Sequence, residues 1–140
     1  MAFDIAPYRS EHFEGVKALW REAFPDDPPW NKADVAIPAK LAVQPELFLL
    51  ALDRDLVIGS IMAGYDGHRG WLYAVAVLHS RRRQGVGAAL VRAAEDRLRS
   101  MGCSKINLQV RATNATVVEF YKRLGYTIEE RTSMGKRVTA

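Results

Sequence analysis

Two patterns of hydrophobic residues meet at the stretch Arg82-Arg83-Gln84-Gly85-Val86-Gly87-Ala88. The run before it, Trp71–Leu78, is short, apolar and rich in β-forming residues, which predicts a buried strand. After it, apolar residues recur at helical spacing as far as Met101, with charged residues largely on the opposite face. That spacing predicts an amphipathic helix. The stretch is therefore expected to turn a strand into a helix.

A turn with glycines and arginines at the start of a helix is expected to bind an anion. The first N–H groups of a helix have no intrahelical partner, and the helix dipole is positive at that end. Gly85 and Gly87 allow a large anion to approach the backbone, while Arg82 and Arg83 add charge and paired donors. The alternative is a solvated basic turn in which glycine only eases the bend.

Length and composition are those of an ordinary globular protein. With 140 residues, 49% of them apolar and 26% charged, the chain is expected to form a single domain over residues 1–140. Its one cysteine, Cys103, fits a reducing compartment, so a cytoplasmic location is expected. Apolar runs such as Leu47–Leu52 are far too short to span a membrane. A net charge of +4 favours a small anionic ligand over nucleic acid.

The remaining segments predict alternating strands and helices, and hence one layered α/β structure. Three prolines between Phe24 and Trp30 exclude a helix interior there, so this segment is expected to be a loop that either covers the core or lines a substrate site. The predicted strands are Phe3–Tyr8, Leu47–Asp53, Leu56–Tyr65, Ser104–Val110, Gly125–Arg131 and Ser133–Val138, and the other predicted helices are Glu11–Ala23, about Asn31 to Ala42, and Ala115–Arg123.

Two motifs resemble those of one enzyme family. Arg82-x-x-Gly85-x-Gly87 after a strand resembles the acetyl-coenzyme A motif of the GNAT N-acetyltransferases, Arg/Gln-x-x-Gly-x-Gly/Ala. The segment from Asn114-Ala115 through Phe120-Tyr121 to Gly125-Tyr126 resembles that family's C-terminal motif, and the order of elements agrees. Within the family, Pro29–Asn31 and Gly64–Gly70 resemble the YpeA branch of bacterial acetyltransferases.

The resemblance implies an α/β (α+β) fold, with a mixed, mostly antiparallel central sheet of about six to seven strands and about four helices. It also implies direct transfer of the acetyl group of acetyl-coenzyme A to a primary amine of a small molecule or peptide, without a metal. In the family the strand before the motif carries a bulge, which corresponds here to Val75-Ala76-Val77, and a free backbone N–H there would polarise the thioester carbonyl. From the sequence alone, the alternative is a fully paired core strand. The expected cofactor contacts are Val75, Ala76, Val77, Arg82, Arg83, Gln84, Gly85, Val86, Gly87, Ala88, Asn114 and Tyr121.

Tyr121 occupies the position of the family's general acid, which protonates the departing thiolate. An unperturbed tyrosine has a pKa near 10 and a thiol a pKa near 8.5, so the pair is workable without a large shift. The alternative is a core aromatic residue. Asn114 would bond the pantetheine arm, cap the helix that follows, or do both.

The general base is not identified by the motifs. The segment Leu108–Arg111 carries Gln109 where ribosomal-protein N-terminal acetyltransferases have glutamate, and an amide cannot accept the proton. The candidates for the base are Asp66 and Tyr65, Tyr73 through a water, His79, and Asp26 or Asp27. The candidate substrate-binding residues are Asp26, Asp27, Trp30, Asn31 and Tyr73.

Three other functions stay open. The first is a ribosomal-protein-type N-terminal acetyltransferase, which Gln109 disfavours. The second is a non-catalytic acetyl-coenzyme A sensor, against which Tyr121 argues. The third is a small nucleic-acid-binding domain, which the lack of exposed basic and aromatic residues along a strand disfavours. The histidines and Cys103 are too scattered to predict a metal site, and the chain is expected to be a monomer or a homodimer.

Overall fold

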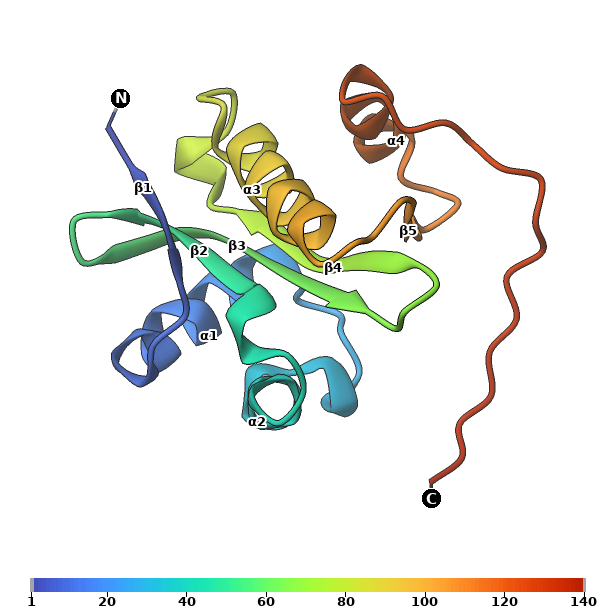
Figure 1. The fold of residues 1–140 in the computed structure, drawn as a ribbon. Helices are drawn as coiled ribbons and strands as arrows, with labels where there is room; N and C mark the ends of the chain where they lie inside the picture. Colours follow the sequence, from blue (N-terminus) through green and yellow to red (C-terminus); the bar gives the residue numbers. More distant parts are fainter. Residues whose placement is uncertain (1, 140) are drawn as a thin grey trace. The chain divides into compact units, whose positions relative to one another are not determined.

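The computed structural model describes residues 2–139. Five strands form one sheet in the order β1-β2-β3-β4-β5, in which the first four are antiparallel to their neighbours and β5 is parallel to β4. A mixed, mostly antiparallel sheet is thus confirmed (Figure 1). The strands are β1 (Asp4–Pro7), β2 (Phe48–Asp53), β3 (Leu56–Tyr65), β4 (Gly70–Val77) and β5 (Ile106–Leu108).

Four α-helices accompany the sheet, as expected, and short 3-10 turns precede several of the elements. The α-helices are α1 (Phe13–Ala23), α2 (Ala33–Leu41), α3 (Val86–Ser100) and α4 (Ala115–Arg123). The 3-10 turns are η1 (Ser10–His12), η2 (Pro29–Asn31), η3 (Pro45–Leu47) and η4 (His79–Arg81).

The chain divides into two compact units, Met1–Gln109 and Val110–Ala140. The first contains the whole sheet and α1 to α3, and the second contains α4 and the segment that follows it. A single domain over residues 1–140 stays a prediction.

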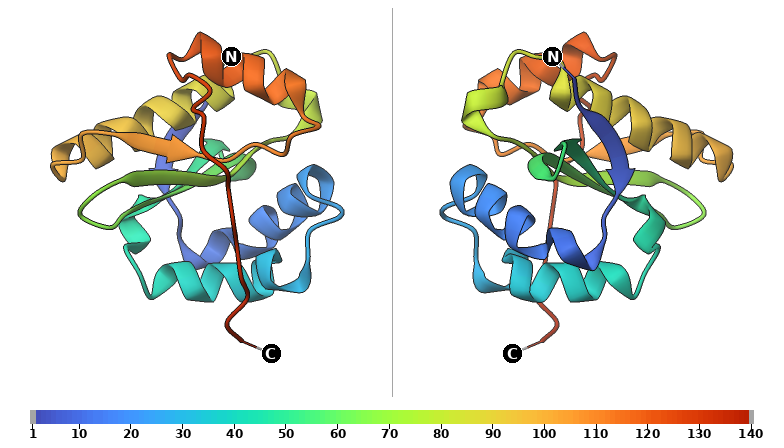
Figure 2. Two further views of the ribbon diagram at one scale, coloured as in Figure 1. Left: turned by 90° about the vertical axis from the view of Figure 1, so that its right-hand side faces the viewer. Right: turned by 90° about the vertical axis from the view of Figure 1, so that its left-hand side faces the viewer.

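In the first unit, α1 and α2 cover one face of the sheet and α3 covers the other (Figure 2). The stripe predicted for α3 is confirmed from Val86 to Leu98, whereas Met101, which lies just beyond the helix, is 39% exposed. On the other face, one cluster joins α1 and α2 to β2 and β3, and its larger members are Val16, Leu19, Trp20, Ile37, Phe48, Leu50 and Met62. Packing on both faces holds β3 and β4 in the middle of the core.

The two strands predicted at the C-terminus are wrong. In the described residues, Gly125–Arg131 and Ser133–Val138 form no strand, so the sheet has five strands rather than six to seven. Gly125 ends α4 with a φ of 98°, and Ile128, Met134 and Val138 beyond it are 71%, 90% and 89% exposed. Alternating apolar residues predict a strand, but a strand forms only where a neighbour completes its hydrogen bonds.

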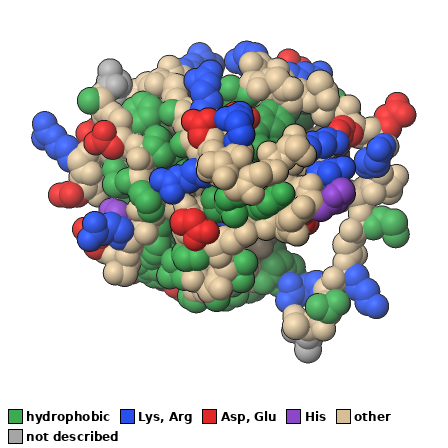
Figure 3. Space-filling view, viewed as in Figure 1, with side chains coloured by type: hydrophobic (Ala, Val, Ile, Leu, Met, Phe, Trp, Pro, Cys, Tyr) green, Lys and Arg blue, Asp and Glu red, His purple; other side chains and the backbone are tan. Residues whose placement is uncertain are grey.

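Side chains of both signs lie among apolar ones on the molecular face in Figure 3. No helix within residues 2–139 combines the length and the apolar character that a membrane span requires.

Candidate functional site

Strand β4 carries a bulge. Ser60 of β3 pairs with Ala76 and Met62 pairs with Tyr73, so Ala74 and Val75 together face the single residue Ile61. Ala74 has a φ of 52°, a left-handed conformation that costs a residue with a side chain about 1–2 kcal/mol. The bulge, expected at residues 75–77, therefore begins one residue earlier, at Ala74.

Beyond the bulge, one edge of β4 is open. Strand β5 pairs only with Gly70–Leu72, so within the described part of the first unit no strand lies beside residues 73–77 on that side. An open strand edge offers its N–H and C=O groups to an extended ligand, which can pair with it as another strand would.

Two buried side chains hold the bulge. The indole N–H of Trp20 donates to Ser60 Oγ at 2.9 Å, and the Ser60 hydroxyl donates to the carbonyl oxygen of Ala74 at 2.8 Å. Ser60 is 0% exposed and Trp20 5%. Sequence reasoning missed both roles. The available signal was a lone hydroxyl in the apolar strand Leu56–Tyr65, because a buried polar group needs a partner.

The segment from β4 to α3 adopts the conformation of an anion-binding turn. Arg83 and Gly85 have φ angles of 63° and 81°, and α3 begins at Val86 with Gly85 as its N-cap. A Cβ added at Gly85 would meet no atom within 4 Å, so glycine is needed there for its φ rather than for space. Gln84 adds a buried Oε1 atom that accepts no hydrogen bond from the described residues.

The arginines of the turn have different roles. Arg81 Nη1 lies 2.8 Å from Asp53 Oδ2, an ion pair that lacks the alignment of a hydrogen bond. Arg82 and Arg83 are exposed and form no ion pair within residues 2–139. Arg81 therefore holds the turn against β2, while the other two remain available to an anion.

Glycine at position 59 brings the bulged strand and the helix start together. A Cβ there would lie 2.9 Å from Leu90 Cδ1 and 3.1 Å from both Val86 Cγ1 and the Ala76 carbonyl oxygen. The first turns of α3 consequently pack directly on β3 beside β4. The predicted donor-side residues of the first unit, on β4 and in the turn, thus lie in one place.

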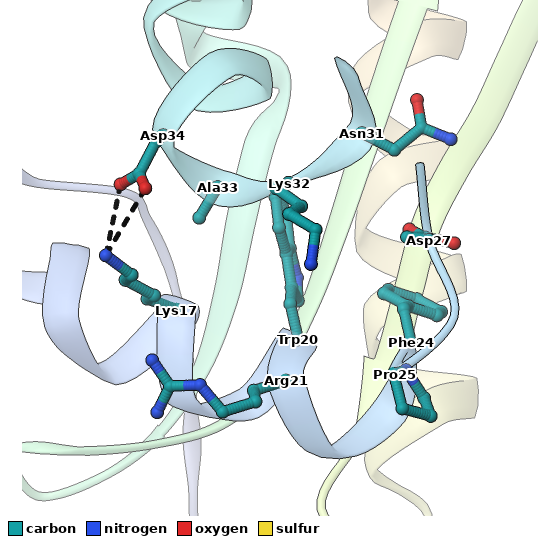
Figure 4. Close-up of a pocket in the computed structure, with 10 residues that line it drawn as sticks. All are labelled: Lys17, Trp20, Arg21, Phe24, Pro25, Asp27, Asn31, Lys32, Ala33 and Asp34. Carbon is teal, nitrogen blue, oxygen red and sulfur yellow. Dashed lines mark hydrogen bonds and ion pairs between the residues drawn. The ribbon is translucent and has the colours of Figure 1, made fainter. Parts of the chain in front are cut away.

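A pocket of about 210 Å³ opens between α1, the loop after it and the start of α2 (Figure 4). It contains the predicted residues Asp27 and Asn31, but Asp26 and Trp30 are not among its lining residues. Trp30 is 46% exposed, whereas Trp20, which lines the pocket, is buried. The lining residues are Lys17, Trp20, Arg21, Phe24, Pro25, Asp27, Asn31, Lys32, Ala33 and Asp34.

Charges of both signs border this pocket. Lys17 Nζ and Asp34 Oδ1 form an ion pair at 3.2 Å, which Figure 4 shows at one end. Arg21 and Lys32 form no ion pair in the described residues. The pocket is thus lined by the carboxylates of Asp27 and Asp34 and also by the unpaired side chains of Arg21 and Lys32, which suit an anion.

The turn between β3 and β4 is closed by Asp66. Its Oδ1 accepts the N–H groups of His68 and Arg69, both at 2.7 Å. These hydrogen bonds, that of Arg69 foremost, lower the pKa of the Asp66 carboxyl, which makes it a weaker base. Tyr65 precedes it, and both its backbone N–H and its carbonyl bond the Gln44 side chain, at 2.9 Å and 2.8 Å.

Tyr73 lies beside a buried lysine that sequence reasoning missed. Lys40 is 5% exposed; its Nζ donates to the Ala63 carbonyl and lies 5.7 Å from the centre of the Tyr73 ring. Burial lowers the pKa of Lys40, opposed by the charge of Glu46, and burial raises the pKa of Tyr73. Tyr73 is not among the residues that line the pocket.

In the second unit, Asn114 is the N-cap of α4, and its Oδ1 accepts the Val117 N–H at 3.4 Å, which confirms the capping role. Tyr121 is 8% exposed, and the centroid of its ring lies 5.0 Å from that of Phe120 and 5.7 Å from that of Tyr126. Burial raises the pKa of Tyr121 to about 12. The hydroxyl is thus a weaker acid than the unperturbed value predicted.

Among the residues that the structure describes, no group of three or more His, Cys, Asp or Glu side chains is placed to hold a metal ion.

A family model for the acetyltransferase (GNAT) family matches residues 13–126. The chain belongs to the GNAT acetyltransferase family. The family prediction is therefore confirmed, and with it the assignment as an acetyltransferase. The GNAT chain is 40% identical to acetyltransferase SG1711 of Sodalis glossinidius over 136 residues, which are 96% of this chain and 95% of the relative. It is 38% identical to an acetyltransferase of Yersinia pestis over 137 residues, again 96% and 95% of the two chains.

A solved structure shows the same GNAT fold. The PaiA N-acetyltransferase from Thermoplasma acidophilum, in complex with coenzyme A, matches with a TM-score of 0.83 and 19% identity over 94% of each chain. The assignment to the YpeA branch within the family stays a prediction.

Proposed function

We propose that this protein transfers the acetyl group of acetyl-coenzyme A directly to a primary amine of a small molecule or peptide. One observation carries the proposal: the open, bulged edge of β4 leads into a helix start with two unpaired arginines. An open strand edge suits the amide-containing arm of coenzyme A, and a helix N-terminus suits its pyrophosphate.

On the donor side, N–H groups of residues 84–88 would hold the pyrophosphate, with charge from Arg82 and Arg83. The edge of β4 at Val75, Ala76 and Val77 would pair with the pantetheine arm. Asn114 is proposed as a further contact to that arm because of its place in the C-terminal motif. Acetyl-coenzyme A supplies the acetyl group and leaves as coenzyme A.

The reaction needs a polarised carbonyl and a proton for the sulfur. A backbone N–H at the bulge would donate to the carbonyl oxygen while the amine nitrogen bonds the acetyl carbon and the C–S bond breaks. The proton that the amine nitrogen loses would pass to the general base, and coenzyme A would leave with the sulfur. Tyr121, which is assigned by its place in the motif, would donate a hydrogen bond from its hydroxyl to the sulfur. With a pKa of about 12, Tyr121 is a weaker acid than a thiol, so its contribution is mainly a hydrogen bond to the developing thiolate.

On the acceptor side, Asp27 and Asn31 in the pocket would receive the amine, and Asp26 and Trp30 flank them on the same loop. Arg21 and Lys32 beside them suit an acceptor that also carries an acidic group. Amino acids and acidic peptides are therefore the first compounds to compare with simple amines and polyamines.

We propose further acceptor contacts at Tyr65 and Asp66, which lie before β4, and at Tyr73 within β4. Asp66 is a weak candidate for the general base because two backbone N–H groups already stabilise its charged form. His79, whose backbone N–H bonds Glu22 Oε2 at 2.8 Å, remains a candidate for the base.

A turnover screen tests the proposal. Acetyl-coenzyme A is incubated with simple amines, polyamines, amino acids and lysine peptides, and thiol release is measured beside the mass of the acetylated product. The proposal predicts acceptor-dependent release with a product heavier by one acetyl group. Tight coenzyme A binding without turnover on any acceptor would instead indicate a sensor. Light scattering checks whether the protein is a monomer or a homodimer.

A further inference from the structure

The hydrogen bonds of Trp20, Ser60 and Ala74 form a continuous chain from α1 through β3 to β4. Trp20 donates to Ser60 at 2.9 Å, and Ser60 donates to the Ala74 carbonyl oxygen at 2.8 Å. The Ser60 hydroxyl thus acts as acceptor and donor at once, and its single proton is committed to Ala74. The chain ends on the left-handed residue of the bulge.

This chain fixes the direction of one backbone donor. The described residues contain no cis peptide bond, and in a trans peptide the C=O and the following N–H point in opposite directions. The hydroxyl that holds the Ala74 carbonyl toward Ser60 therefore aims the Val75 N–H away from it. The β3–β4 register passes from Ala76 to Tyr73 at the bulge, so Ala74 and Val75 have no Cα partners of their own on β3.

We propose that Ser60 and Trp20 are positioning residues that aim the Val75 N–H at the thioester carbonyl. The inference rests on the proposed acetyl transfer and adds to it which donor polarises the carbonyl and what orients that donor. Neither side chain touches the reacting atoms. Their effect passes through the peptide between Ala74 and Val75.

The same chain begins at the pocket. The Trp20 ring lines the pocket, and the N–H of that ring is the first donor of the chain (Figure 4). A ligand in the pocket would therefore contact the residue that orients the bulge.

The test is infrared difference spectroscopy of acetyl-coenzyme A labelled with ¹³C at the thioester carbonyl, bound to the wild type and to Ser60→Ala. A hydrogen bond from Val75 shifts the bound C=O stretch below that of free acetyl-coenzyme A. The shift is expected to shrink in Ser60→Ala and to persist in Ser60→Thr, which keeps the hydroxyl. Once an acceptor is known, kcat should fall at least about tenfold in Ser60→Ala, while the coenzyme A dissociation constant changes less than about threefold.

Ser100→Ala is the matched control, because Ser100 also donates its hydroxyl to a backbone carbonyl at 2.8 Å, that of Arg97 at the end of α3. Its bound carbonyl band should equal that of the wild type. A purely structural role of Ser60 would lower the melting temperature but leave the band of the folded, ligand-bound fraction in place.

An unchanged band in Ser60→Ala, or equal loss in Ser60→Thr, overturns the positioning role and leaves the proposed function standing. If Ser60→Ala does not fold, Trp20→Phe decides by the same shift, since it keeps a ring and removes the first donor. Failure of the wild type to bind acetyl-coenzyme A in calorimetry overturns the proposed function and this inference together.

Discussion

Tyr121 combines deep burial with an ionisable hydroxyl, so its stability contribution depends on pH. The unfolded tyrosine ionises near pH 10, whereas burial raises the folded pKa to about 12. Because the folded pKa is the higher one, the full contribution is present below pH 10 and is lost as the pH rises toward 12. From this group we expect the free energy of unfolding to fall by roughly 2–3 kcal/mol across that window.

Urea unfolding of the wild type and Tyr121→Phe at pH 9 and pH 11.5 measures this effect. The phenylalanine variant should lose less stability over the interval, because it has no hydroxyl to ionise. An equal decline in the two proteins would contradict the raised pKa.

The same substitution tests the role of the hydroxyl in catalysis. Tyr121→Phe keeps the ring and its edge contacts to Phe120 and Tyr126, so the fold should persist. We expect kcat to fall by about 10²–10³, as for loss of one donor to a developing anion, with little change in acetyl-coenzyme A affinity because one neutral hydrogen bond contributes only about 0.5–1.5 kcal/mol. An acyl donor with a more acidic thiol should partly restore the rate relative to wild type. A variant within about threefold of wild type, with chemistry rate-limiting, would make Tyr121 a packing residue.

The left-handed conformation of Ala74 predicts different effects on stability for a smaller and a larger side chain. Ala74→Gly relieves about 1–2 kcal/mol of left-handed strain, offset by the roughly 0.4–1 kcal/mol of extra freedom in the unfolded chain. Its stability should therefore stay within about 1 kcal/mol of wild type. Ala74→Val places a β-branched side chain at a φ of 52° and should cost more than about 2 kcal/mol. Denaturant midpoints check both, and a fully stable valine variant would contradict the left-handed bulge.

At the scale of elements, the turn before α3 contains one arginine that pairs with β2 and two that are proposed to bind the cofactor. Arg83→Ala removes an exposed charge without a partner and should weaken coenzyme A binding about 10–100-fold, more so at low salt, with unchanged stability. Arg81→Ala is the matched variant: it breaks the pair with Asp53 and should lower the free energy of unfolding by about 1–2 kcal/mol. Calorimetry and urea unfolding of each variant give the comparison. Equal binding losses from both would reject this division.

The helix and strand periods predicted the elements of the first unit because local patterns are sufficient there. The stripe from Val86 to Leu98 on α3 and the bounds of β3 follow from spacing alone. The period of a segment does not show whether another strand lies beside it, which is why Gly125–Arg131 was wrongly predicted to be a strand. The function of Asn114 as a cap was predictable, since an N-cap acts on its own helix.

Site features that depend on contacts between distant residues could not be predicted. Nothing near Arg81 in the sequence shows that Asp53 pairs with it, and nothing near Ser60 shows that Trp20 and Ala74 are its partners. The positions of residues in the two motifs predicted the donor-side residues. The pocket beside Asp27 could not be predicted, because it forms only when α1 packs near α2.

At the scale of the whole molecule, the predicted single domain can be tested with a ligand. Coenzyme A at one hundred times its dissociation constant should raise the free energy of unfolding by about 2.7 kcal/mol. If residues 1–140 unfold as one domain, calorimetry should show one transition that moves upward as a whole. Gly87→Glu, which places a side chain and a negative charge in the first turn of α3, is the control that should abolish the shift. Two transitions, of which only one moves, would show that Met1–Gln109 and Val110–Ala140 unfold separately.

Gly59 has a consequence for how this enzyme can diversify. Because a Cβ at this position would press on Leu90, Val86 and the Ala76 carbonyl oxygen, even alanine there would require these neighbours to shift. The first turns of α3 therefore tolerate little added volume at this position, on the side where the acetyl donor is expected to bind. The loop between α1 and α2 is exposed at Pro25 and Asp26, whereas Phe24 at its start packs against the core. Substitutions at these two exposed positions are accordingly expected to change the surroundings of the pocket without displacing α3 from β3.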